Sequence, residues 1–114
     1  DEVALHGPTA AVLFRDGEIR HLTITPEEAG VEPAPLRALA GGGPDENAAW
    51  LIGILEGKGH PAHADAIALN AGTLAWVTGK ATTIAAGVKQ ARSALHGGGG
   101  ARRLALMAEL SHGA

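Results

Sequence analysis

The residues whose types and spacing are best suited to binding chemistry are two adjacent carboxylates, Asp1 and Glu2, which precede a turn at Gly7 and Pro8. Neighbouring carboxylates supply the oxygen ligands that a hard cation such as Mg²⁺ prefers. An acidic pair is also often simply solvated, because charged side chains are rarely buried and gain little from exposed pairing. From the residues alone, the solvated pair is the preferred interpretation and a Mg²⁺ site is the alternative.

Three further segments contain residue types that occur in binding sites. His60, His63 and Asp65 could form a metal cluster, but they lie in a proline-containing segment that is better explained as a loop between helices. The run Gly97–Gly100 lacks the Lys-Ser/Thr continuation of a phosphate-binding loop and follows no strand, so it is predicted to link two helices. Asn70 lies on an apolar helical face, where satisfying a neighbouring backbone group is favoured over ligand binding. No Ser-His-Asp, Cys-His or Walker pattern can be assembled.

Composition excludes several classes of protein. The 114 residues carry a net charge of −3 and are 18% charged, which gives no basic field for nucleic acid or anionic membranes. Cysteine is absent, so disulfide and thiolate chemistry are excluded. No apolar run approaches the ~18 residues of a membrane span, and no signal peptide is apparent, so a soluble, cytoplasmic protein without a membrane partner is expected. The chain opens with Asp1 and has its only methionine at Met107, so we expect a piece of something longer.

Two amphipathic helices, near residues 45–56 and 65–78, are predicted to form the core. Asp45 is the predicted cap of the first helix, and Gly57 and Gly79 are the predicted stops. Because the connection between the helices is short, they are expected to be antiparallel neighbours. The apolar stripes expected to be buried are Ala48, Leu51, Ile52 and Leu55 in the first helix, and Ile67, Ala71, Leu74 and Thr78 in the second.

A β-hairpin is predicted over residues 10–25. Asp16-Gly17 is a preferred pair for a two-residue type I′ turn, and this turn pairs Arg15 with Glu18. The same register pairs Phe14 with Ile19 and Val12 with His21. The face that carries these four residues is predicted to pack inward.

The remaining segments predict short turns and two more helices. Thr25–Gly30 has the pattern of a capped helical corner, and residues 36–40 allow a short helical turn. A third helix is expected over residues 83–96, capped by Thr82 or Thr83, and a fourth over residues 101–110. The third helix is expected to bury Ile84, Val88, Ala91 and Leu95. The chain is therefore predicted to be one unit, residues 1–114, mainly α-helical with an antiparallel β-hairpin.

The order of several short motifs resembles the C-terminal third of anthranilate phosphoribosyltransferase, of the glycosyltransferase family 3 type. Residues 1–9 resemble the family's Asp-Glu-Ile-Ser segment and its following Gly-Pro-Thr, and Asp16–Ile19 resembles its hairpin. Thr25–Gly30 is similar to Thr-Pro-Glu-Asp-Phe-Gly, with Ala29 in place of the aromatic residue. The other matching segments are Gly42-Gly43, Glu46–Ala48, Leu55–Gly57, Leu69–Ala71, Gly79–Ala81, Gly87-Val88 and Ala91.

The resemblance implies an α/β fold in the intact enzyme, with this chain as part of its large α/β domain. It also implies a pentosyltransferase that transfers phosphoribosyl from phosphoribosyl pyrophosphate to anthranilate in tryptophan biosynthesis. By the same resemblance, Asp1 and Glu2 become ligands of the Mg²⁺ cofactor, which reverses the interpretation from the residues alone. No catalytic residue and no residue that contacts an organic cofactor is implied in this chain.

The family's pyrophosphate loop, its Lys-His-Gly-Asn-Arg segment and its anthranilate contacts have no counterpart here. The resemblance therefore implies that the chain is inactive by itself, joins an N-terminal part of the same protein, and belongs to a homodimer when intact. Two alternatives are a non-catalytic nucleic-acid-binding relative of the same fold, which the acidic net charge counts against, and a related nucleoside phosphorylase.

Overall fold

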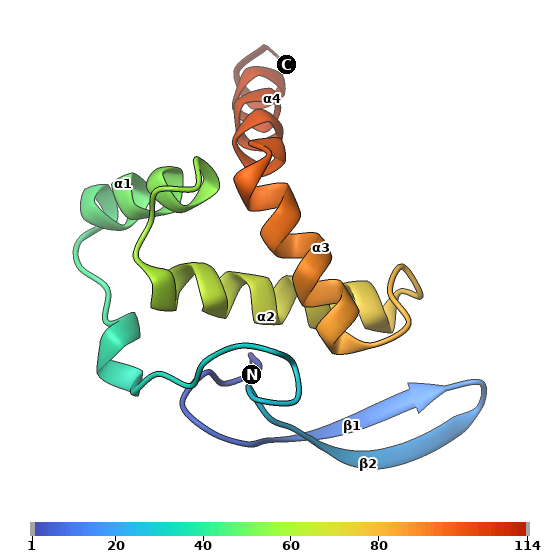
Figure 1. Ribbon diagram of the computed structural model, residues 1–114. Coiled ribbons are helices and arrows are strands. Elements are labelled where there is room, and N and C mark those ends of the chain that lie inside the picture. The colour runs from blue at the N-terminus through green and yellow to red at the C-terminus, as the bar shows by residue number, and fades with distance from the viewer. Residues whose placement is uncertain (1, 114) are drawn as a thin grey trace.

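The computed structural model describes residues 2–113 and shows a hairpin followed by helices (Figure 1). Over these residues the predicted class, mainly helical with an antiparallel hairpin, is confirmed. The elements in chain order are β1 (Thr9–Arg15), β2 (Glu18–Ile24), the 3₁₀ turn η1 (Leu36–Leu39), α1 (Pro44–Leu55), α2 (Pro61–Val77), α3 (Ile84–His96) and α4 (Gly99–Gly113).

The closest packing in the chain is between α2 and α3, which cross at two glycines. A Cβ added to Gly72 would lie 2.5 Å from the backbone nitrogen of Val88, and one added to Gly87 would lie 2.8 Å from the Cα of Gly72. Real Cβ atoms do not come so close to backbone, so both positions need glycine for the helices to touch. The backbone contact between Gly72 and Gly87 fixes the point at which the two helices cross.

The core lies where α2 and α3 meet the N-terminal segment and the corner after β2. Its six buried side chains come from all four of these regions and are at most 4% exposed; they are Leu5, Ala29, Val31, Ala68, Leu69 and Val88. On α3, Val88 and Leu95 are buried and Ile84 and Ala91 are half-buried, which confirms the predicted face of that helix.

The predicted face of α2 is wrong. Ala71, Leu74 and Thr78 are exposed, Leu74 to 64%, and Ile67 is only half-buried. The buried residues are instead Ala68, Leu69 and Gly72. Apolar residues lie on most sides of this helix, so the size of the apolar side chains did not determine which face is buried. The face that carries the small residues Ala68 and Gly72 is buried, because small residues let α3 approach the α2 backbone.

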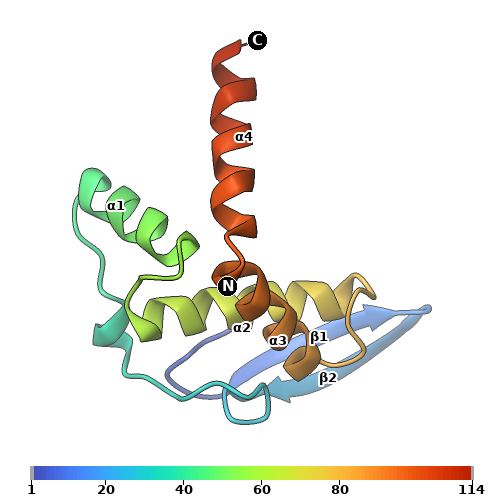
Figure 2. The same ribbon diagram turned by 45° about the horizontal axis from the view of Figure 1, so that its top comes forward.

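α1 is not part of the core, which corrects the prediction for the first helix. Ala48, Leu51 and Ile52 are exposed, Leu55 is half-buried, and Ile54 is the buried residue of this helix. Figures 1 and 2 show α1 standing beside the α2–α3 pair and α4 extending away from it. The described residues therefore cover the apolar stripe of α1 only in part, at Leu55.

The hairpin has the predicted turn and register but packs with the other face. Asp16 and Gly17 both have positive φ, at 52° and 79°, as a type I′ turn requires. Arg15 pairs with Glu18, Phe14 with Ile19, and Val12 with His21. Val12, Phe14 and Ile19 are nevertheless 64–70% exposed. The inward side chains are Leu13, Leu22 and Ile24.

Arg15 explains part of this choice of face. Its Nη2 donates to the carbonyl oxygen of Trp76 at 2.9 Å, and its guanidinium carbon lies 5.1 Å from the centre of the Trp76 ring. Trp76 lies in the last turn of α2, where unpaired carbonyls and the helix dipole attract a cation. The hairpin therefore docks on α2 through the face that carries Arg15.

Several helix ends differ from the prediction. α1 begins at Pro44, with Gly43 before it donating its backbone N–H to Glu46 at 3.0 Å, so Asp45 is not the cap. α2 begins at Pro61, four residues earlier than expected, because proline fits the first helical position. The cap of α3 is Thr83, whose hydroxyl accepts from the backbone N–H of Ala86 at 3.0 Å, as predicted.

The chain is looser than a self-contained domain of its size. Its radius of gyration is 15.2 Å, against about 13 Å expected for a compact domain of this length. Large apolar side chains are exposed on the hairpin, on α1, on the outer face of α2 and on α4. Many exposed apolar side chains are typical of faces that another part of a protein covers.

Candidate functional site

The segment that follows the acidic pair is fixed at three successive residues. Asp1 lies outside the described residues, and Glu2 is exposed at the start of the segment. The backbone of Val3 is hydrogen-bonded to the side chain of Asn70 in α2, and the backbone N–H of Ala4 donates to the hydroxyl of Thr9. The carbonyl of Leu5 accepts from the backbone N–H of Ala34. Glu2 is therefore attached to a backbone that has little freedom.

Asn70 binds both polar backbone groups of Val3. Its Oδ1 accepts from the Val3 N–H at 2.9 Å, and its Nδ2 donates to the Val3 carbonyl at 3.1 Å. The same Nδ2 donates to the carbonyl of Ala66, one helical turn back, at 3.0 Å. The expectation that Asn70 satisfies a backbone group is confirmed, although the sequence did not indicate that its partner lies 67 residues away.

Thr9 and Leu5 close the segment into a short loop. The Thr9 hydroxyl accepts from the backbone N–H of Ala4 at 2.9 Å, which ties the start of β1 back to the acidic end. Leu5 is 1% exposed, and its carbonyl accepts from the N–H of Ala34 at 3.1 Å. The loop is therefore held by core burial as well as by hydrogen bonds.

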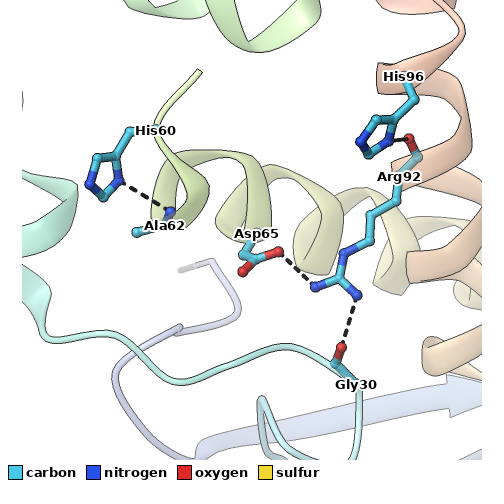
Figure 3. A network of polar contacts seen from close by, with 6 residues as sticks. All are labelled: Gly30, His60, Ala62, Asp65, Arg92 and His96. Atoms are coloured by element: carbon cyan, nitrogen blue, oxygen red, sulfur yellow. Dashed lines mark hydrogen bonds and ion pairs between the residues drawn. The ribbon is translucent and has the colours of Figure 1, made fainter. Parts of the chain in front are cut away.

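A second polar network joins α2, α3 and the corner after β2 (Figure 3). Arg92 of α3 donates from Nη2 to Asp65 at 2.7 Å and from Nη1 to the carbonyl of Gly30 at 3.0 Å. Figure 3 shows the Arg92 side chain reaching from α3 to both partners. This network holds the two helices and the corner in one arrangement, and so fixes the helix that carries Asn70.

The three residues considered as a metal cluster have other roles. His60 Nδ1 accepts from the backbone N–H of Ala62 at 3.2 Å and so caps α2, and Asp65 is paired with Arg92. The His63 ring lies 5.6 Å from that of His60 and 5.7 Å from that of Trp50. Within residues 2–113 no group of three or more histidine, cysteine or acidic side chains is placed to hold a metal ion.

Gly97 and Gly98 of the four-glycine run join α3 to α4, as predicted, whereas Gly99 and Gly100 are the first residues of α4. α3 ends at His96, and α4 begins at Gly99. Gly98 has a φ of 72°, and Arg102 donates from Nη1 to the carbonyl of Gly97 at 3.1 Å. An arginine bonded to a carbonyl just after α3 is a helix-terminating contact, so this run has a structural explanation.

The acidic end has the donor chemistry that Mg²⁺ needs. Mg²⁺ is commonly held by one or two carboxylates, with waters and substrate phosphates completing the octahedron, so a cage of three protein ligands is not required. Glu2 offers an exposed carboxylate on a backbone that is held at the next three residues. Among the described residues, the chemistry of the exposed Glu2 carboxylate therefore fits that of one Mg²⁺ ligand.

The sequence pattern of the glycosyl transferase family, a/b domain, matches residues 1–101. The chain belongs to this family. It is 51% identical to the anthranilate phosphoribosyltransferase of Sorangium cellulosum (strain So ce56) over 97% of this chain and 32% of the relative. It is 44% identical to the enzyme of the same name from Aeromonas hydrophila subsp. hydrophila over 98% of this chain and 33% of the relative.

A solved structure also matches this chain. The crystal structure of anthranilate phosphoribosyltransferase (TrpD) from Thermus thermophilus superposes with a TM-score of 0.68 at 44% identity, over 70% of this chain and 24% of the other. The chain thus spans about a third of the length of the curated relatives it matches. The resemblance seen in the sequence is confirmed. Among the helices within residues 2–113, none combines the length and apolar character needed to cross a membrane.

Proposed function

We propose that this chain is part of an anthranilate phosphoribosyltransferase, a pentosyltransferase that transfers phosphoribosyl from phosphoribosyl pyrophosphate to anthranilate in tryptophan biosynthesis. The observation that carries the proposal is identity of 44–51% to proteins of that name over nearly the whole chain. Chance similarity of short motifs does not extend at this level over more than a hundred residues. The acidic net charge gives no support to the alternative of a nucleic-acid-binding relative.

In this proposal Asp1 and Glu2 hold Mg²⁺ together with the pyrophosphate of the substrate. The cation, when bound, neutralises the negative charge that develops on the leaving pyrophosphate. The carboxylates bind and orient; they transfer no proton. The anchored backbone at Val3, Ala4 and Leu5 supports this role because a ligand on a fixed backbone loses less conformational freedom when the ion binds.

The rest of the active site is proposed to come from an N-terminal part of the same protein. The proposal assigns the pyrophosphate loop and the anthranilate contacts to that part, so the chain alone is expected to be inactive. The exposed apolar faces of α1 and of the hairpin support it, since they are surfaces on which further elements can pack. The intact enzyme is proposed to be a cytoplasmic homodimer.

The test of the site is a pair of neutral substitutions, Asp1→Asn with Glu2→Gln, in the full-length enzyme. Amides keep the shape of the side chains but remove the charge that a hard cation prefers. The Mg²⁺ concentration for half-maximal phosphoribosyl transfer is expected to rise at least about ten-fold, with folding unchanged. The measurement is transfer to anthranilate as a function of Mg²⁺.

The matched control is Glu27→Gln with Glu28→Gln, which neutralises a different pair of adjacent acidic residues, both of them exposed. The control is expected to leave the Mg²⁺ dependence unchanged. If the Asp1 and Glu2 variant shows the Mg²⁺ dependence of the wild type, the metal role is wrong. A full-length wild-type protein that transfers no phosphoribosyl to anthranilate would overturn the proposed function itself.

A further inference from the structure

The contact between Asn70 and Val3 joins the middle of α2 to the residue next to the acidic pair. Val3 immediately follows Glu2, whereas Asn70 lies 67 positions further along the chain than Val3. Figures 1 and 2 show the N-terminal segment passing close to α2. From this geometry we infer that Asn70 is a positioning residue for the Mg²⁺-binding carboxylates, an inference that rests on the function proposed above.

The amide of Asn70 fixes the Val3 backbone in the way that a neighbouring strand would. It accepts from the Val3 N–H and donates to the Val3 carbonyl, at 2.9 and 3.1 Å. Two bonds to one residue restrict both of its backbone dihedrals, which a single bond would not do. The peptide that joins Glu2 to Val3 is held as a result, because the Val3 nitrogen belongs to it.

The orientation of the amide is itself determined by its surroundings. Nδ2 uses its two hydrogens on the carbonyls of Val3 and Ala66, which leaves Oδ1 to face the Val3 N–H. A flipped amide would direct the NH₂ group against the Val3 N–H and the oxygen against two carbonyls. One orientation is therefore strongly preferred, and the position of Val3 follows from the position of α2.

α2 in turn is rigidly placed at this point. Leu69, the preceding residue, is fully buried, and Gly72 is at the backbone contact with α3. Through Val3, Asn70 thus ties the backbone next to Glu2 to the most closely packed part of the chain. Partners that orient metal ligands typically change metal affinity by about 10- to 100-fold when they are removed.

Asn47 provides a matched control with the same chemistry elsewhere. Its Oδ1 accepts from the N–H of Gly42 at 2.9 Å, and its Nδ2 donates to the Gly42 carbonyl at 3.0 Å. Both asparagines therefore bind the N–H and carbonyl of one backbone residue, but only Asn70 binds next to the acidic pair. Replacing either asparagine with alanine, the best helix former, disturbs the helices least.

The experiment uses the full-length enzyme and two readouts besides activity. Hydrogen exchange of the peptide that contains Val3 and Ala4 reports whether the contact is lost, and calorimetry of phosphoribosyl pyrophosphate binding at varied Mg²⁺ reports the Mg²⁺ requirement. Asn70→Ala is expected to speed exchange at Val3 and to raise the Mg²⁺ requirement about ten-fold, with the KM for anthranilate little changed. Asn47→Ala is expected to change neither readout.

A folded Asn70 variant that exchanges faster at Val3 but keeps the wild-type Mg²⁺ requirement would overturn the inference. If Asn70→Ala does not fold, Asn70→Gln retains the amide and displaces it by one methylene, and the same comparison of exchange with Mg²⁺ requirement applies. Failure of the proposed function is distinguished from failure of the inference, since it appears in the wild type, as absence of transfer or of any Mg²⁺ dependence of substrate binding.

Discussion

The α2–α3 pair and α1 both contain many apolar residues but differ in what covers them. Leu69 of α2 and Val88 of α3 are at most 1% exposed, whereas Trp50, Leu51 and Ile52 of α1 are 41–47% exposed. The pair is held by a backbone contact and by the network around Arg92. α1 is attached mainly at its C-terminal end, where Ile54 is buried.

This difference separates two requirements for a buried helix face. A helix needs an apolar stripe, which α1 has, and a partner of complementary shape, which α2 and α3 provide to each other through Gly72 and Gly87. The segment that carries the candidate site is attached to the packed region, through Asn70 and Leu5. The candidate site therefore depends on the part of the chain that is already well packed.

The largest expected effect is at Leu69. Leu69→Ala removes a fully buried side chain and leaves a cavity, so the free energy of unfolding should fall by about 3 kcal/mol. Leu51→Ala in α1 is its matched control, because Leu51 is 41% exposed, and it should cost less than about 1 kcal/mol. Urea unfolding of the 114-residue chain measures both. Equal losses would mean that the two regions are packed alike.

The same pair of variants sharpens the comparison in the full-length enzyme. If an N-terminal part covers α1 there, the cost of Leu51→Ala should rise to about 2–3 kcal/mol, while that of Leu69→Ala stays the same. A cost for Leu51→Ala that remains small in the full-length enzyme would show that this face of α1 stays open.

The second effect concerns glycines in the two regions. Gly87→Ala should destabilise the chain by about 2 kcal/mol, since the added methyl group meets the backbone of Gly72 and the helices must separate. Gly53→Ala in α1 should instead stabilise it by about 0.5–1 kcal/mol, because nothing lies within 4 Å of the added carbon and alanine favours the helix. Urea unfolding should thus give changes of opposite sign. A stabilising Gly87→Ala would contradict the close crossing.

Local signals in the sequence were sufficient to predict that the hairpin and the four helices form. The Asp16-Gly17 turn set the hairpin register, and Thr83 and Gly57 marked helix ends, because each acts on neighbouring residues. Packing could not be derived in the same way. Both hairpin faces carry apolar residues, and the decisive contact of Arg15 is with Trp76, 61 positions away.

The buried face of α2 can be compared with the sequence features that could have predicted it. Gly72 and Gly87 stand inside helical segments, where glycine is unfavourable, which is compatible with a close approach by another backbone. This signal is not sufficient by itself, because Gly53 also lies inside a helix and has nothing within 4 Å of an added Cβ. Size and hydrophobicity pointed instead to Ile67 and Leu74. For the candidate site, the acidic pair was visible in the sequence, but the contact of Asn70 with Val3, the residue that follows the pair, depends on the tertiary fold.

The smallest of the three effects concerns ion pairs in the two regions. Arg92 and Asp65 join α2 to α3 at 2.7 Å, with side chains 38% and 22% exposed, and Arg92 also bonds Gly30. Lys58 and Glu56, after α1, lie 3.6 Å apart with side chains 77% and 47% exposed. Partly buried charge-assisted bonds contribute more than exposed pairs, which are screened by water.

Arg92→Met should therefore lower the free energy of unfolding by about 1–2 kcal/mol, because it leaves a partly buried Asp65 carboxylate and the Gly30 carbonyl without this donor. Lys58→Met, the matched control, should change it by less than about 0.5 kcal/mol. The double variant Arg92→Met with Asp65→Leu should recover part of the loss, because it removes the carboxylate that is left unpaired. Urea unfolding of the three variants measures these differences. If Arg92→Met and Lys58→Met cost the same, the Arg92 network does not help to hold the corner, α2 and α3 together, and the packing of α2 then rests on the glycine crossing and the apolar core.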